Sequence, residues 1–182
     1  SYRASYGSGQ MVMGVPFAGR SSLAMDQRRG IWITDADSFA VIRLNLDADT
    51  TLVLVAAEPG IPLTEADIND WRERLKGQFE QLPNLADDMM ALMPEARPPL
   101  AGAFTDDQDR LWLGRTVPTD TAPRWDVFTP EGEFLSTVRG PTGVNAFLTP
   151  VVRGDRILLF VEGEVGERYI VVAELPERLR GE

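Results

Sequence analysis

The amino-acid sequence predicts an all-β fold in which short antiparallel sheets repeat along the chain. A polar turn followed by a short apolar run occurs three times, as RRGIWITD, DQDRLWLG and RGDRILLF. Each copy is followed by further strand-length apolar segments, separated by residues that favour turns. Trp112 of the second copy aligns with Leu158 of the third, an offset of about 46 residues that matches the roughly 40–50 residues of a propeller blade. The sequence therefore predicts β-propeller blades, in about three four-stranded antiparallel meanders.

The first unit is predicted from the strands around and after Trp32. The segment VIRLNL alternates apolar and polar residues, as a half-buried strand does, whereas TLVLV is apolar throughout, as a strand buried on both faces is. Asp47-Ala48-Asp49 provides the turn between them. Asp26 precedes Trp32 by six residues, and Asp106 precedes Trp112 by the same interval. A large aromatic residue at one repeat position predicts packing between neighbouring blades.

A helical insertion is predicted over about residues 64–93, after the first full blade. The first two repeat copies are about 80 residues apart, too far for one blade, and the insertion accounts for roughly thirty of these. In LTEADINDWRERLKGQFEQL, Thr64 is the expected N-cap and Asp67 completes a variant capping box. Pro83 is expected to end this helix, and LADDMMALMP is predicted to form a second, shorter one. The first helix carries a stripe of apolar residues at helical spacing: Ile68, Trp71, Leu75, Phe79 and Leu82.

The remaining two units complete the predicted domain, residues 1–182, as a partial β-propeller. The second unit has two strands around Glu131-Gly132, where glycine supplies the positive φ of a tight hairpin. The third unit has three strands, with ILLF again predicted to be buried on both faces, and it reaches PERLRGE without a fourth. Residues 2–6 are predicted to form the outer strand of a blade. Known propellers have about 4–8 blades, so further sequence or a second copy is expected to complete the ring, and an open three-blade arrangement or a different β fold is the alternative.

The composition excludes several classes of function. The 182 residues include no histidine and no cysteine, which rules out imidazole acid–base catalysis, a cysteine nucleophile, a disulfide and a Cys/His zinc site. The formal net charge of -10 repels phosphate backbones, so no nucleic-acid partner is expected. No apolar stretch approaches the ~20 residues of a membrane-spanning helix, and the chain is not expected to span a membrane. The lack of cysteine favours a periplasmic or extracellular location.

The phrases DQRRGIWITDADSFAVIRLNLDADTTLVL, DDQDRLWLGRT and WDVFTPEGEFLSTV carry a resemblance to a known family. In these residues the chain resembles bacterial six-bladed β-propellers of the NHL and SMP-30-like groups, over most of its length apart from the insertion. The resemblance implies a partial chain of three blades. It also implies a binding scaffold, because propellers of this kind are mostly binding modules, and a minority are calcium-dependent lactonases or esterases.

Clustered carboxylates are the candidate metal ligands. They occur in TDADS (34–38), LDADT (46–50) and TDDQD (105–109), and Ca²⁺ prefers such oxygens. Counted from Asn45, an EF-hand loop fails because Thr50 stands where glycine is required and Ala56 where glutamate is required. Aspartates in hairpin turns accept hydrogen bonds from their own backbone, which is the role expected here. No cofactor is therefore expected, with calcium as the alternative, and no catalytic or metal-ligating residue is assigned.

The helical insertion carries the candidate partner-binding surface. Blades rarely need such an insertion for stability, and methionine-rich faces adapt to different partners. The six candidate residues are Trp71, Leu75, Phe79, Met89, Met90 and Met93. The predicted function is a non-enzymatic binding or scaffold module that acts through contacts with a protein partner or a second copy. The alternatives are a calcium-dependent lactonase or esterase and a peripheral subunit of a membrane-associated complex.

Overall fold

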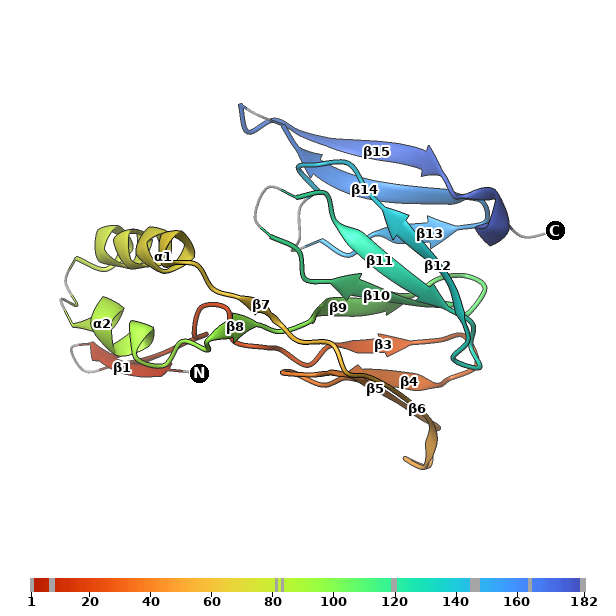
Figure 1. Ribbon diagram of the computed structural model, residues 1–182, viewed down its shortest axis with the longest axis horizontal. Coiled ribbons are helices and arrows are strands. Elements are labelled where there is room, and N and C mark those ends of the chain that lie inside the picture. The colour runs from red at the N-terminus through yellow and green to blue at the C-terminus, as the bar shows by residue number, and fades with distance from the viewer. Residues whose placement is uncertain are drawn as a thin grey trace.

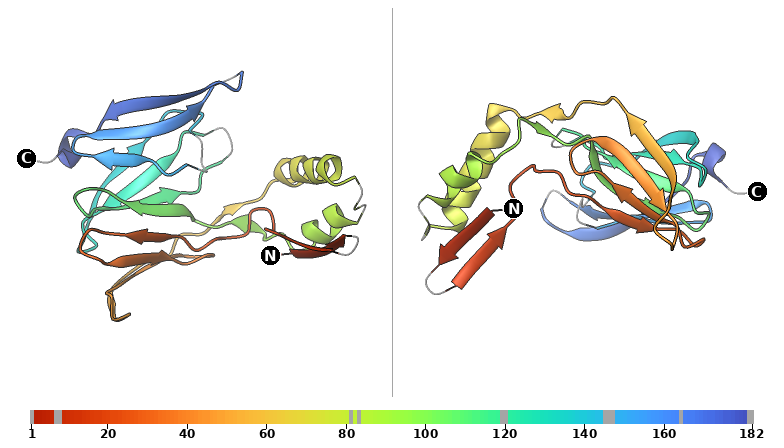
Figure 2. Two further views of the ribbon diagram at one scale, coloured as in Figure 1. Left: turned by 180° about the vertical axis from the view of Figure 1, so that it is seen from behind. Right: turned by 90° about the horizontal axis from the view of Figure 1, so that it is seen from below.

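Three antiparallel sheets stacked face to face form the body of the protein, with the helical insertion beside them (Figure 1). The computed structural model describes residues 2–6, 9–80, 82, 84–118, 121–144, 148–163 and 165–180. The second sheet lies between the first and the third, and the insertion extends from one end of the stack (Figures 1 and 2). The all-β, propeller-like fold with an inserted helical unit is thus confirmed.

Each sheet is a meander whose strands pair in chain order. The first sheet contains β3 (Leu23–Met25), β4 (Ile31–Thr34), β5 (Phe39–Leu44) and β6 (Thr50–Ala56). The second contains β9 (Leu100–Thr105), β10 (Leu111–Arg115), β11 (Arg124–Phe128) and β12 (Phe134–Arg139). The third contains β13 (Val151–Arg153), β14 (Arg156–Glu162) and β15 (Arg168–Glu174). The 3₁₀ turn η1 (Glu177–Leu179) follows.

The predicted hairpin turns fall where their residues allow a left-handed backbone. Ala48 has φ of 63° in the turn between β5 and β6, and Asn45 accepts hydrogen bonds from the N–H groups of Asp47 and Asp49 there. Gly132 has φ of 87° in the turn between β11 and β12. A left-handed residue is what a tight antiparallel connection requires. Both turns predicted from the sequence are therefore confirmed.

A buried aspartate holds the tryptophan in each of the first two sheets. Asp26, in the hairpin before β4, accepts a hydrogen bond from the Trp32 indole N–H at 3.2 Å. Asp106, in the hairpin before β10, accepts one from the Trp112 indole N–H at 2.8 Å. Both indoles are fully buried, so each N–H needs an acceptor inside the protein. The interval of six residues between aspartate and tryptophan, which occurs in both repeat copies, therefore reflects this hydrogen bond.

The third hairpin is shorter and lacks the buried aspartate. Arg153 pairs directly with Arg156, so the turn consists of Gly154 and Asp155, and Gly154 has φ of 60°. The position aligned with the two tryptophans holds Leu158, which carries no side-chain N–H. The third copy of the phrase therefore keeps the apolar strand without the hydrogen-bonded network.

Apolar cores fill both spaces between the sheets. The first is formed by Trp32, Phe39, Val41, Leu100, Leu111 and Leu113. The second is larger and includes Phe104, Trp112, Trp125, Val127, Val138, Val152, Ile157, Leu159, Val161, Leu175 and Leu179. The two repeat tryptophans thus pack between neighbouring sheets, as their equivalent positions predict.

The insertion consists of α1 (Glu65–Gln78) and α2 (Leu85–Met90) and is joined to the stack by the pair β7 (Ile61–Pro62) and β8 (Ala96–Arg97). The predicted capping box is present, because Thr64 accepts from the Asp67 N–H and Asp67 accepts from the Thr64 N–H. The helix α1 ends before Leu82, earlier than its apolar stripe predicts, with Phe79 as C-cap. Pro83, the predicted terminator, lies outside the described residues.

The N-terminal strand is not part of a blade, and that prediction is wrong. Strand β1 (Tyr2–Tyr6) pairs with β2 (Gly9–Met13), and this hairpin lies against the insertion (Figures 1 and 2). Tyr2, Met11 and Met13 pack on the apolar cluster of the two helices. The pattern of residues 2–6 predicts a strand but does not specify the strand with which it pairs. The neighbouring strand β2 contains Met11 and Met13, whose apolar side chains pack on the insertion.

Asp67→Asn is expected to weaken α1 and to remove part of its sensitivity to acid. Hydrogen bonds from the Thr64 N–H and hydroxyl lower the pKa of Asp67, and Arg97 contributes further. Because the folded-state pKa lies below the unfolded value of about 3.9, this stabilisation is present above that value and is lost as the pH falls through the lowered folded pKa. Amide-exchange protection factors of α1 across this pH range test the prediction. Glu65→Gln removes a neighbouring acid without removing the cap, and an identical acid profile in the two variants would contradict it.

Candidate functional site

The two outer faces of the sheet stack carry exposed apolar side chains, among them Leu23, Val55 and Ile170. Directly paired residues of an antiparallel sheet project to the same face. The pairs Leu23–Ile33 and Ile42–Val53 therefore share the face of the first sheet that points away from the second. We call this the first outer face, with members Leu23, Met25, Ile31, Ile33, Ile42, Val53 and Val55.

The third sheet ends the stack with a similar surface. Leu158 pairs with both Val151 and Val172, and Phe160 pairs with Ile170. Their side chains lie on the opposite face from Ile157, Leu159 and Val161, which belong to the core between the second and third sheets. We call this the third outer face, with members Val151, Leu158, Phe160, Ile170 and Val172.

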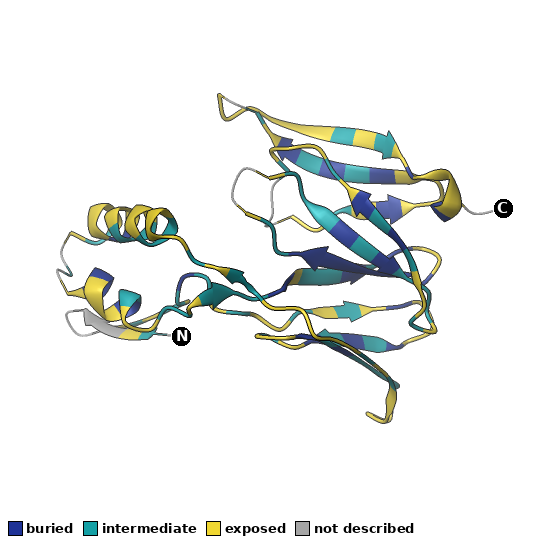
Figure 3. Cartoon of the chain, viewed as in Figure 1, coloured by how far each residue is buried: buried dark blue, intermediate teal, exposed yellow. Residues whose placement is uncertain are grey.

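Both outer faces are open to solvent. Val55 is 72% exposed on the first, and Ile170 is 56% exposed on the third. Figure 3 shows β6 and β15 largely exposed, in contrast with the buried second sheet between them. The sequence predicts that TLVLV and ILLF are buried on both faces, and the structure leaves one face of each sheet uncovered. Contiguous exposed apolar surface of this kind marks an interaction site.

The two faces of each sheet differ in composition. The face toward the following sheet carries large aromatic residues, Trp32 and Phe39 in the first sheet and Trp112 and Trp125 in the second. The face toward the preceding sheet carries no tryptophan: Leu111 and Leu113 lie there in the second sheet together with Phe128, and valine, isoleucine and leucine lie there in the third. The outer faces continue this order, because the first is entirely aliphatic and the third contains Phe160.

Charged residues border the third outer face at both ends. Arg156 pairs across the strands with Arg153 and Glu174 at one end. At the other end Glu162 pairs with Arg168, with 3.7 Å between carboxylate and guanidinium. An apolar centre with a charged rim is the usual anatomy of a protein–protein interface.

The insertion residues predicted to bind a partner lie mostly in their own cluster. Leu75 and Met89 are 3% and 1% exposed, so the structure corrects their place from the surface to the core of the insertion. They are buried because the two helices and the N-terminal hairpin close over them. Trp71, Phe79 and Met90 are half-buried and pack against this cluster, and Met93 is also half-buried. Partner binding through these four residues stays a prediction.

The carboxylate cluster at residues 34–38 serves the turn in which it lies, whereas Asp107 and Asp109 of the third cluster accept hydrogen bonds from the backbone N–H groups of Gly154 and Gln27 in neighbouring hairpins. Asp35 accepts hydrogen bonds from the N–H groups of Asp37 and Ser38 and from the Ser38 hydroxyl, at 2.8–2.9 Å. These bonds lower the pKa of Asp35, that from the Asp37 N–H most strongly. Within the described residues, no group of three or more acidic side chains is arranged to hold a metal ion. The capping role predicted for aspartate is confirmed at Asp35.

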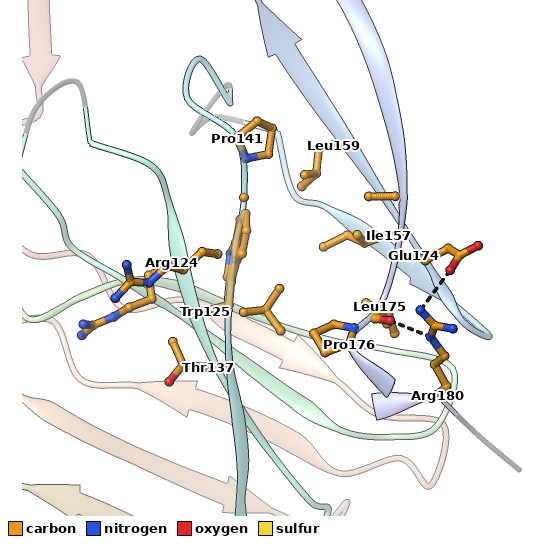
Figure 4. A pocket seen from close by; sticks show the side chains of 14 residues that line it. Arg124, Trp125, Thr137, Pro141, Ile157, Leu159, Glu174, Leu175, Pro176 and Arg180 are labelled. Carbon is orange, nitrogen blue, oxygen red and sulfur yellow. Dashed lines mark hydrogen bonds and ion pairs between the residues drawn. The ribbon is translucent and has the colours of Figure 1, made fainter. Parts of the chain in front are cut away.

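A pocket of about 620 Å³ opens between the second and third sheets. Figure 4 shows Trp125 standing between Arg124 on one side and Ile157 and Leu159 on the other. Arg180 donates to the carbonyl of Leu175 at 2.8 Å at the far end. The pocket is largely apolar with basic groups at its ends. No sequence pattern predicts it, because its walls come from strands of two different sheets.

The comparisons with known proteins are sparse. No protein-family model matches the sequence, and no curated protein matches it. A solved streptogramin B lyase structure is similar over 92% of this chain and 44% of its own, at 13% sequence identity and a TM-score of 0.35. This chain therefore spans less than half the length of that one. No helix among the described residues has the length and apolarity needed to cross a membrane.

Proposed function

We propose that the protein is a non-enzymatic binding scaffold whose two outer faces pack on the sheets of a second copy. The observation that carries the proposal is the pair of exposed apolar faces at opposite ends of one stack. Flat apolar sheets are suited to contact with another protein surface, whereas a catalytic site encloses its reacting groups in a concave pocket.

The composition of the two outer faces favours a second copy of the chain as the partner that covers them. Within the chain, a face with tryptophan meets a face that is rich in leucine, isoleucine and valine. The third outer face, with Phe160, therefore matches the aliphatic first outer face of another copy. Such a contact joins different surfaces of the two copies, and it closes into a ring where the rotation allows. Two copies would form a ring of six sheets, within the roughly 4–8 blades of known propellers.

Light scattering on the purified protein tests the proposal. Wild-type protein is expected at twice the monomer mass of 20.1 kDa. A first-face variant, Val53→Lys with Val55→Lys, and a third-face variant, Ile170→Lys with Val172→Lys, are each expected to be monomeric, because every contact needs one face of each kind. Lysine is tolerated on edge strands, and β6 and β15 are edges of their sheets. Val165→Lys, at an 89% exposed hairpin position, is the control and should leave the dimer intact.

Mixing the two variants makes the test specific to this arrangement. Each copy then supplies the face that the other lacks, so one intact contact forms and the dimer mass returns. Wild-type protein that stays monomeric at every concentration would overturn the second-copy proposal. Dimers in either variant alone would exclude the contact between unlike faces.

A further inference from the structure

Three arginines form one row across the end of the second sheet. Arg115 on β10 pairs with Arg124 on β11, and Arg124 pairs with Arg139 on β12. Paired side chains leave the sheet on the same face, with Cβ atoms about 4.5–5.5 Å apart. The Arg115 guanidinium lies 4.6 Å from the Phe39 ring, so this row faces the first sheet. Like charges directly opposite each other destabilise a sheet, so the row has a cost that needs an explanation.

The protein neutralises one end of the row. Arg115 forms an ion pair with Glu58 and lies 3.5 Å from Asp126. Burial lowers the pKa of Arg115 and the charge of Arg124 lowers it further, while Asp126 opposes both effects. No ion pair within the described residues involves Arg124 or Arg139. Nε of Arg124 is buried and has no hydrogen-bond partner there.

The row forms one wall of a pocket between the second sheet and the segment that follows β6, which contributes Glu58, Pro59 and Ile61. This pocket has a volume of about 480 Å³, and its lining includes Ile61 of β7, the strand that leads to the insertion. Its size falls within the roughly 300–1,000 Å³ of small-molecule sites. Thr116 and Thr121 add hydroxyl groups, and Pro59 and Val117 add apolar wall. Arg124 and Arg139 lie side by side and form no ion pair within the described residues, which is unexpected in a chain with a formal net charge of -10.

We propose that this arginine pocket binds a small organic oxyanion, that is, a carboxylate or phosphate group attached to an apolar body. Neighbouring strands are about 4.8 Å apart, so one oxyanion can accept hydrogen bonds from Arg124 and Arg139 together. The planar guanidinium groups present paired donors that match the oxygens of carboxylates and phosphates. The anion relieves the repulsion within the row, and the apolar wall holds the attached body.

Isothermal titration calorimetry on the full chain tests the pocket with three probes: inorganic phosphate, phenyl phosphate and benzoate. Sodium chloride at matched ionic strength is the blank. Saturable binding is expected, with phenyl phosphate tighter than inorganic phosphate because its ring contacts the apolar wall. Benzoate shows whether the pocket accepts carboxylates as well as phosphates. Arg124→Gln and Arg139→Gln are each expected to weaken binding about tenfold, as the loss of a charge-assisted hydrogen bond does.

Matched variants separate a built site from general attraction. Arg178→Gln removes an exposed arginine of η1, outside the lining of this pocket, and should leave binding unchanged. Arg124→Lys keeps the charge but loses the planar fork, and it should weaken binding nearly as much as Arg124→Gln. Arg139 is exposed, so Arg139→Gln keeps the test valid even where substitution of Arg124 disturbs folding. The proposal is overturned if no probe binds saturably, if chloride competes equally, or if Arg178→Gln weakens binding as much as Arg139→Gln.

Discussion

Asp106→Ala is expected to lower the free energy of unfolding by about 3–5 kcal/mol, the cost of leaving a buried cation without its partner. The Asp106 carboxylate is fully buried and accepts from Arg110 Nε at 2.6 Å and from the Trp112 indole at 2.8 Å. Its other oxygen accepts from the backbone N–H groups of Gln108 and Arg110. Alanine leaves all four donors without this acceptor. Arg110 also donates to the carbonyl of Leu179, so the disturbance reaches the last turn of the described chain.

Urea unfolding followed by tryptophan fluorescence and circular dichroism measures this loss. Asp155→Ala is the matched control, because it removes the aspartate of the third hairpin, whose side chain is 56% exposed. That variant should stay within about 0.5 kcal/mol of wild type. Equal effects of the two substitutions would mean that the hairpin aspartates contribute through turn geometry and not through the buried acceptor.

Leu75→Ala and Met89→Ala are each expected to cost the insertion about 2–5 kcal/mol of local stability, the usual range for emptying a buried site. Both side chains lie in the cluster formed by α1, α2 and the N-terminal hairpin. This cluster has no member in common with the two cores between the sheets. The insertion should therefore open on its own while the sheets stay folded.

Hydrogen–deuterium exchange mass spectrometry resolves this effect by segment. Peptides from α1, α2 and β2 should lose protection, whereas peptides from β10 and β11 should keep it. Leu92→Ala changes an exposed leucine of the same insertion and should leave all segments unaffected. Loss of protection in the second sheet would show that the insertion and the stack unfold as one unit.

The repeated phrase predicts the sheets because one short signal contains both the buried strand and the turn before it. Trp32 and Trp112 stand at the same repeat position, and both are fully buried between sheets. The insertion is equally local, since Thr64 and Asp67 are three residues apart and make their capping bonds within one turn. Such features depend on neighbours in the chain and are therefore accessible from sequence.

Features that depend on register or on distant partners were missed. The row of Arg115, Arg124 and Arg139 comes from three strands, and a slip of one residue in one strand would move its arginine to the other face. The predicted place of β1 in a blade was wrong for a similar reason, because the residue pattern of a strand does not specify the sheet to which the strand belongs. The apolar character of Val53 and Val55 was evident, but the sequence does not say that their side of the sheet is left uncovered.

The short ladder between β7 and β8 makes the helical unit an exchangeable cassette. Ile61 lies opposite Arg97 and Pro62 opposite Ala96, so the chain leaves the stack and returns to it at adjacent points. Replacing the helical insertion between β7 and β8 with a tight turn, or with an unrelated domain, would require no change in the positions of β6 and β9. The entropy of closing a longer loop at such a point rises slowly with its length. Evolution or an engineer can thus add recognition elements here without redesigning the sheets.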